Sequence, residues 1–74
     1  MIGRLVALKP HLDQIVLRIN RGTDLRRHPP LLKRGEFGFV LLKDQGSKFS
    51  FQYYIMSSCG QVGWVFADDV QEIL

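Results

Sequence analysis

The chain has 74 residues, of which 46% are apolar, and a formal net charge of +3 at neutral pH. This length fits one small domain over residues 1–74, and the apolar content excludes an intrinsically disordered chain. The single cysteine, Cys59, excludes an internal disulfide and fits a reducing compartment. No apolar run approaches the ~20 residues that span a bilayer, and the start lacks the apolar region of a signal peptide. We therefore expect a cytoplasmic protein without membrane contact.

The charge is distributed unevenly along the chain. Residues 1–34 hold eight Lys or Arg against two Asp, a net charge of +6, whereas residues 35–74 hold two Lys against five Asp or Glu, a net charge of −3. Such an asymmetry can orient a molecule towards an acidic partner. A solvated basic loop explains the same pattern, so charge alone leaves both interpretations open.

Two short strands are predicted near the start. Leu5–Lys9 forms the first, and Pro10 ends it because proline has no N–H to donate to a sheet. Gln14–Asn20 favours a second strand, since its β-branched residues disfavour the alternative of a short helix. At period two its apolar residues share one face: Ile15, Leu17 and Ile19.

A basic loop is predicted over Arg21–Pro30. Gly22 interrupts regular structure, and Pro29 and Pro30 favour an extended path into the next strand. Leu32–Glu36 then predicts a turn, in which Gly35 supplies a positive φ between polar residues that face water.

The second half predicts strands joined by hairpin loops. Phe37–Lys43 is a strong strand, and Asp44–Ser47 is a hairpin loop. Lys48–Ser57 shows the clearest period-two alternation in the chain, with Phe49, Phe51, Tyr53 and Ile55 on one face and Ser50, Gln52, Tyr54 and Met56 on the other. Ser58–Gln61 predicts the next hairpin loop.

The closing stretch Gly60–Ile73 contains two glycines, the apolar run Trp64-Val65-Phe66, the polar break Ala67-Asp68-Asp69 and a last short strand. This pattern resembles the end of an SH3 domain, and Leu32–Glu36 resembles its diverging turn. The resemblance covers most of residues 5–73. It implies an all-β fold, a small SH3-like barrel of five or six short antiparallel strands with a short 3-10 turn before the last strand. The spacing Gly35-x-x-Gly38-x-Val40 also resembles the KOW-type barrels of translation and transcription proteins.

Three departures from SH3 domains weaken the expectation of a proline-motif groove. The stretch Leu5–Lys9 lacks the family's first-strand aromatic motif, and the tandem tryptophan before the third strand is absent. Phe66, Asp68 and Asp69 occupy the positions where the family usually has Pro, Asn and Tyr. A fourth departure concerns the core, because Gly38 stands where these domains place an apolar core residue. The scaffold is therefore expected to carry a different binding surface.

No catalytic, metal or cofactor site is predicted. Asp68 and Asp69 are adjacent, so a tight turn leaves both in water, and His11 and His28 lie on separate segments. Cys59 has no base close in sequence and is interpreted as a plain exposed thiol. Potential metal ligands are few and scattered. We expect a protein that is not an enzyme and takes no small-molecule substrate.

We expect some of the aromatic residues to be buried and others to be partly exposed. The phenylalanines Phe37, Phe39, Phe49 and Phe51 are expected to fill the barrel. Tyr54, Trp64 and Phe66 are expected to stay partly exposed, and Tyr and Trp are enriched at interfaces because they are apolar and still form hydrogen bonds.

These expectations define a non-catalytic binding module that docks on a partner protein. The expected contacts are the basic loop and the neighbouring aromatics: Arg21, Arg26, Arg27, His28, Lys33, Arg34, Tyr54, Trp64 and Phe66. One alternative is a nucleic-acid-binding KOW-like barrel, whose affinity would fall steeply with salt. A second alternative is a small structural subunit of a larger complex, which would show large apolar exposure.

Overall fold

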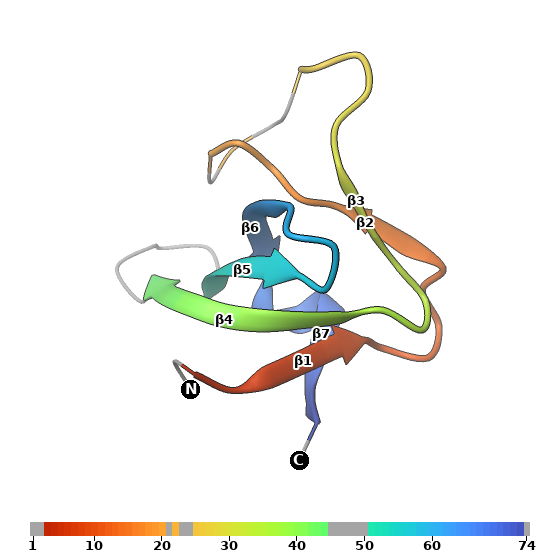
Figure 1. Cartoon of the computed structure of the whole chain (residues 1–74), viewed down its shortest axis with the longest axis vertical. Helices are drawn as coiled ribbons and strands as arrows, with labels where there is room; N and C mark the ends of the chain where they lie inside the picture. Colours follow the sequence, from red (N-terminus) through yellow and green to blue (C-terminus); the bar gives the residue numbers. More distant parts are fainter. Residues whose placement is uncertain (1–2, 21, 23–24, 45–50, 74) are drawn as a thin grey trace.

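Seven short strands and one 3-10 turn make up the part of the chain that the structure describes (Figure 1). The structure is a computed structural model, and it describes residues 3–20, 22, 25–44 and 51–73. The elements are β1 (Leu5–Leu8), β2 (Gln14–Val16), β3 (Leu31–Lys33), β4 (Phe37–Asp44), β5 (Gln52–Ser57), β6 (Val62–Phe66), η1 (Ala67–Asp69) and β7 (Val70–Ile73). The all-β fold and the 3-10 turn before the last strand are confirmed. No helix within the described ranges is long and apolar enough to cross a membrane.

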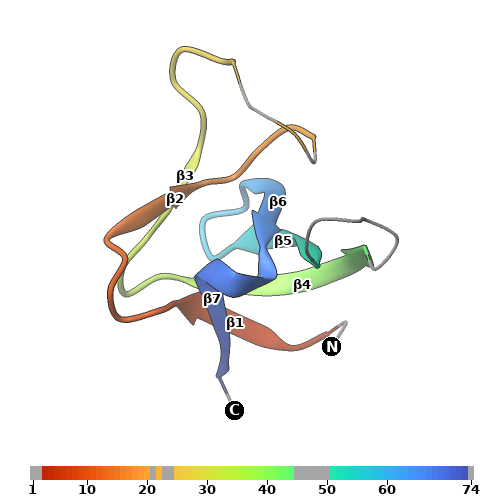
Figure 2. The same ribbon diagram turned by 180° about the vertical axis from the view of Figure 1, so that it is seen from behind.

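The strands form two antiparallel sheets. The larger sheet has the order β6-β5-β4-β1-β7, and the smaller one pairs β2 with β3. The two sheets are linked where the chain leaves β2, because Arg18 forms an isolated bridge with Trp64 of β6. The described residues contain seven strands, whereas the sequence predicts five or six. The additional strand is Leu31–Lys33, which pairs with Gln14–Val16 instead of only leading into a turn. After Arg18, the described part of the connection between β2 and β3 extends away from the five-stranded sheet (Figures 1 and 2).

The turn after β3 forms as the sequence predicts. Gly35 has a φ of 90°, a conformation that glycine adopts without a steric cost. The N–H of Glu36 donates to the carbonyl of Lys33 at 3.0 Å. The Glu36 carboxylate in turn accepts the N–H of Lys33 at 2.7 Å. Backbone and side chain therefore close the same turn and send the chain into β4.

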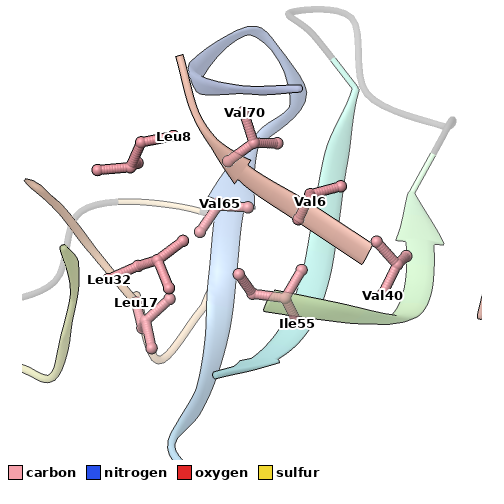
Figure 3. Close-up of a cluster of buried hydrophobic side chains, with 8 residues drawn as sticks. All are labelled: Val6, Leu8, Leu17, Leu32, Val40, Ile55, Val65 and Val70. Atoms are coloured by element: carbon pink, nitrogen blue, oxygen red, sulfur yellow. The ribbon is translucent and has the colours of Figure 1, made fainter. Parts of the chain in front are cut away.

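The core consists of aliphatic side chains from both sheets and the segments beside them (Figure 3): Val6, Leu8, Leu17, Leu32, Val40, Ile55, Val65 and Val70. The expectation that phenylalanines fill the barrel is wrong for those that the structure describes, because Phe37, Phe39 and Phe51 are all exposed. Phe49 lies outside the described residues. In β4, alternation turns Gly38 and Val40 inward, which necessarily turns the flanking Phe37 and Phe39 outward.

The long period-two strand is shorter than expected. β5 begins at Gln52, and the hairpin loop expected at Asp44–Ser47 falls largely outside the described residues. Tyr53 and Ile55 share a face, as the alternation predicts, and this face packs against the core. The register with β4 shifts between Val40 and Leu42, where one extra residue forms a bulge.

Candidate functional site

Two of the predicted aromatic residues form a pair on the outer face of β5 and β6. Tyr54 lies opposite Trp64 in the strand register. Their ring centroids are 5.2 Å apart and the ring planes are inclined by 53°. Both side chains are half-buried. Tilted aromatic contacts of this kind add about 0.5–1.5 kcal/mol beyond area burial, so each ring holds the other in place.

The third predicted aromatic residue, Phe66, lies next to this pair and is covered by a cation. Phe66 is opposite Gln52 in the register, one row from Tyr54 and Trp64. The Cζ atom of Arg18 lies 4.0 Å from the centroid of the Phe66 ring. The Arg18 guanidinium donates from Nη1 to the carbonyl of Gly22 at 3.0 Å. It also donates from Nη2 to Oε1 of Gln52.

Arg18 is therefore a member of this site that sequence reasoning missed. Its side chain is buried, which is unusual for arginine and is tolerated only when the charge finds partners. The period-two alternation places Arg18 on the strand face opposite Ile15, Leu17 and Ile19. The available signal was a single cation inside an apolar run, which is too common to indicate burial.

The chain around Arg18 approaches β6 very closely. Arg18 and Trp64 exchange two backbone hydrogen bonds, of 3.1 and 2.8 Å. A Cβ placed on the neighbouring Gly63 would lie 2.7 Å from the Cα of Leu17 and nearer still to its carbonyl carbon. Only a glycine fits between these two segments, so the aromatic residues of β6 and the segment that carries Arg18 are fixed against each other.

Two of the predicted loop cations make internal contacts. Arg26 donates from Nη2 to the carbonyl of Leu17 at 2.9 Å. Arg34 donates to the carbonyls of Pro10 at 2.7 Å and Leu12 at 3.0 and 3.2 Å. Arg34 thus ties the turn after β3 to the connection between β1 and β2.

Arg34→Ala is expected to lower the free energy of unfolding by about 1–2 kcal/mol, because three carbonyl contacts are lost from a partly exposed cation. Its ion pair with Asp13 spans 3.1 Å, but the Asp13 side chain is 91% exposed. Asp13→Ala should therefore cost less than about 0.5 kcal/mol. Urea denaturation of both variants measures the difference, and equal losses would show that the ion pair rather than the carbonyl contacts matters.

The remaining basic residues are exposed but do not form one cluster with the aromatic pair. Arg27, His28 and Lys33 are all exposed. His28 and Lys33 line an open groove of about 450 Å³ with Pro29, Pro30, Leu31, Glu36, Cys59 and Gln61. Arg21 lies outside the described residues. The structure thus brings together Tyr54, Trp64 and Phe66 with Arg18, and places His28 and Lys33 in a separate groove.

Cys59 is an exposed free thiol in the turn between β5 and β6. Its Sγ lies 3.1 Å from the hydroxyl oxygen of Ser57 and 3.6 Å from Oε1 of Gln61. Among the residues that the structure describes, no group of three or more His, Cys, Asp or Glu is placed to hold a metal ion.

Comparison of the chain with protein-family models, with curated proteins and with solved structures gives no match. The assignment of a function therefore rests on the arrangement of the residues described above: an aromatic pair, a cation stacked on Phe66, and exposed basic residues outside this cluster.

Proposed function

We propose that the chain is a non-catalytic, SH3-like module that docks on a partner protein through its aromatic pair and the adjoining loop. The order of the elements supports the family. After β1, the chain makes a long connection in which β2 and β3 pair with each other. The turn at Gly35 leads into β4, β5 and β6, and the 3-10 turn η1 precedes β7. The last strand pairs with the first. The free thiol of Cys59 supports a reducing, cytoplasmic location.

The observation that carries the docking proposal is the fixed pair of Tyr54 and Trp64. Aromatic side chains that are held in place lose little conformational entropy on binding, and Tyr and Trp dominate the binding energy of protein interfaces. Phe66, held under Arg18, extends this surface. Arg27, on the loop between β2 and β3, is exposed and supplies positive charge for an acidic region of the partner.

A nucleic-acid partner has weaker support. Phosphate binding draws on many free cations, and affinity then falls steeply with salt. The guanidinium groups of Arg26 and Arg34 already donate to backbone carbonyls. Fewer of their N–H groups therefore remain to bind phosphate. These internal hydrogen bonds do not involve the side chains of Tyr54 and Trp64. Protein docking is therefore the function that this geometry favours.

Trp64→Ala tests the proposal and is expected to lower partner retention by about 30-fold or more, the loss typical of an aromatic hot spot. Retention from native extract, with and without nuclease treatment, is quantified by mass spectrometry. Trp64→Phe is the conservative variant, and Arg4→Ala, beside β1 rather than on β5 or β6, is the control. Arg27→Ala should lower retention several-fold, with a modest salt dependence.

Unchanged retention by a folded Trp64→Ala variant would contradict the docking site. Loss of retention on nuclease treatment alone would contradict the protein partner. An NMR titration of the labelled domain with generic RNA and DNA at two salt concentrations completes the test, because salt-sensitive shifts on Arg27 and Lys33 would favour the nucleic-acid alternative.

A further inference from the structure

The two residues that follow β2, Leu17 and Arg18, join the loop between β2 and β3 to the aromatic strand β6. The N–H of Leu17 donates to the carbonyl of Pro30 at 2.9 Å, where the loop returns to β3. The N–H and the carbonyl of Arg18 instead pair with Trp64 of β6. Successive residues of an extended segment direct their backbone groups to opposite sides. This dipeptide therefore pairs with the end of the loop on one side and with β6 on the other.

Two arginine side chains attach the described part of the loop to the same dipeptide. The Arg18 guanidinium donates from Nη1 to the carbonyl of Gly22 at 3.0 Å. The Arg26 guanidinium donates from Nη2 to the carbonyl of Leu17 at 2.9 Å. Both hydrogen bonds are partly buried, and hydrogen bonds from charged donors are among the stronger ones in proteins. The loop is thus held at Gly22, at Arg26 and at Pro30.

The Leu17–Arg18 dipeptide is itself a fixed point of the fold. The Leu17 side chain is completely buried in the core. Its backbone lies so close to Gly63 of β6 that no side chain fits between them. Because protein interiors are densely packed, such a contact leaves little freedom of movement. A group tied to this dipeptide therefore keeps a constant position relative to the neighbouring Trp64.

Arg26 and Arg27 are neighbours in the sequence, but their side chains have different surroundings. Arg26 donates inward to Leu17, whereas Arg27 is exposed beside His28. The Cα atoms of adjacent residues are only about 3.8 Å apart, so fixing Arg26 also restricts the position of Arg27. A loop that must be ordered on binding loses backbone entropy, and a loop that is already held in place loses less. An internal contact of Arg26 can therefore raise affinity without touching a partner.

We propose that Arg26 is a positioning residue of the docking surface. It holds the exposed Arg27 in a fixed place relative to Trp64, so a partner that contacts both residues finds them already arranged. The inference rests on the proposed docking function. It gives Arg26 an internal role in place of the partner contact that the sequence predicts.

Order parameters of the backbone amides in the free, full chain test this role without a partner. In the wild type, nitrogen relaxation of Leu25, Arg27 and His28 should give order parameters of about 0.8, close to those of β5. In Arg26→Met they should fall below about 0.6. Arg27→Met is the matched control, because it removes the same group from the adjacent residue, and it should leave these values unchanged. Circular dichroism first establishes that the variants are folded, and Arg26→Gln is used if Arg26→Met is not.

Partner retention in the extract assay gives the consequence for docking. Arg26→Met should lower retention about tenfold, which corresponds to the ordering of one backbone residue on binding. A direct contact between Arg26 and the partner would also lower retention, but it would leave the order parameters of the free chain unchanged. That combination would overturn the positioning role.

Three further results would also overturn it. Wild-type order parameters below about 0.6 would show that the loop is not held. An equal decrease in Arg27→Met would show that the hydrogen bond of Arg26 is not the cause. Unchanged retention by an Arg26→Met variant whose loop is loosened would show that the arrangement does not matter for docking. Failure of the docking function is distinguishable, because unchanged retention by Trp64→Ala contradicts the docking site, whereas the order parameters of the free chain do not depend on a partner.

Discussion

Gly63→Ala is expected to lower the free energy of unfolding by at least about 3 kcal/mol, a large share of the stability of a domain this small. The added Cβ would lie 2.7 Å from the Cα of Leu17, and the nearest atoms belong to backbone and Cβ rather than to the end of a flexible side chain. The two segments must separate to accept it, which breaks the backbone hydrogen bonds between Arg18 and Trp64.

Gly38→Ala is the matched control for this prediction. A Cβ on Gly38 would also be too close to a neighbour, at 2.6 Å, but that neighbour is the terminal Cδ1 of Ile55. Rotation of a flexible side chain relieves such a clash, so the cost should stay near 1 kcal/mol. Urea denaturation measures both variants. Equal losses would show that the contact between β6 and the Leu17 segment does not constrain the fold.

The local features of the fold could be predicted from the sequence because they depend on few neighbouring residues. The turn at Gly35 needs only a glycine between polar residues, and the turn closes through contacts between Lys33 and Glu36, three residues apart. The break after β6 follows from the polar residues of Ala67–Asp69 after an apolar strand, whereas its 3-10 form is what the resemblance to SH3 domains implies. Such signals lie within a short window, so the pattern of residue types is enough to identify them.

The composition of the core could not be predicted in the same way. Alternation shows that Phe37 and Phe39 share a face, but it does not show which face turns inward. The register of β4 between β1 and β5 decides this, and it places Gly38 opposite Ser57 and beneath Ile55. Hydrophobicity favoured the phenylalanines as core residues, yet the small interior is filled by branched aliphatic side chains instead.

In the candidate site, too, some features could be predicted from neighbouring residues and others depend on residues far apart in the sequence. Partial exposure of Tyr54 and Trp64 follows from their amphipathic side chains, and the structure places both on one face with Phe66. The role of Arg18 depends on Gln52, which is 34 residues away, and on Phe66. No local pattern brings these three residues together, so the buried cation becomes visible only in the folded chain.

Arg18→Met should lower the free energy of unfolding by about 3 kcal/mol, because it removes the only cation stacked on Phe66 in the described structure and leaves the Gln52 amide buried without that donor. Arg18→Lys should lower the free energy of unfolding by nearly the same amount. An ammonium group can neither stack as a plane on Phe66 nor reach the Gly22 carbonyl and Gln52 together.

The double variant Arg18→Met with Gln52→Leu separates the two contributions. If part of the cost of Arg18→Met arises from the loss of the hydrogen bond to the buried Gln52 side chain, replacing that side chain by an apolar group should restore about 1 kcal/mol. The double-mutant cycle gives the coupling between the two residues. Strict additivity of the single changes would contradict a direct contact.

The same set of variants tests whether Arg18 orders the loop. Arg18 holds the Gly22 carbonyl at 3.0 Å, so its loss should free the loop between β2 and β3 even where stability is restored. Amide hydrogen exchange should then rise at Gly22 and Leu25 in the double variant while β4 and β5 stay protected. Unchanged exchange at these residues would show that the loop is ordered by other contacts and that Arg18 serves only to cover Phe66.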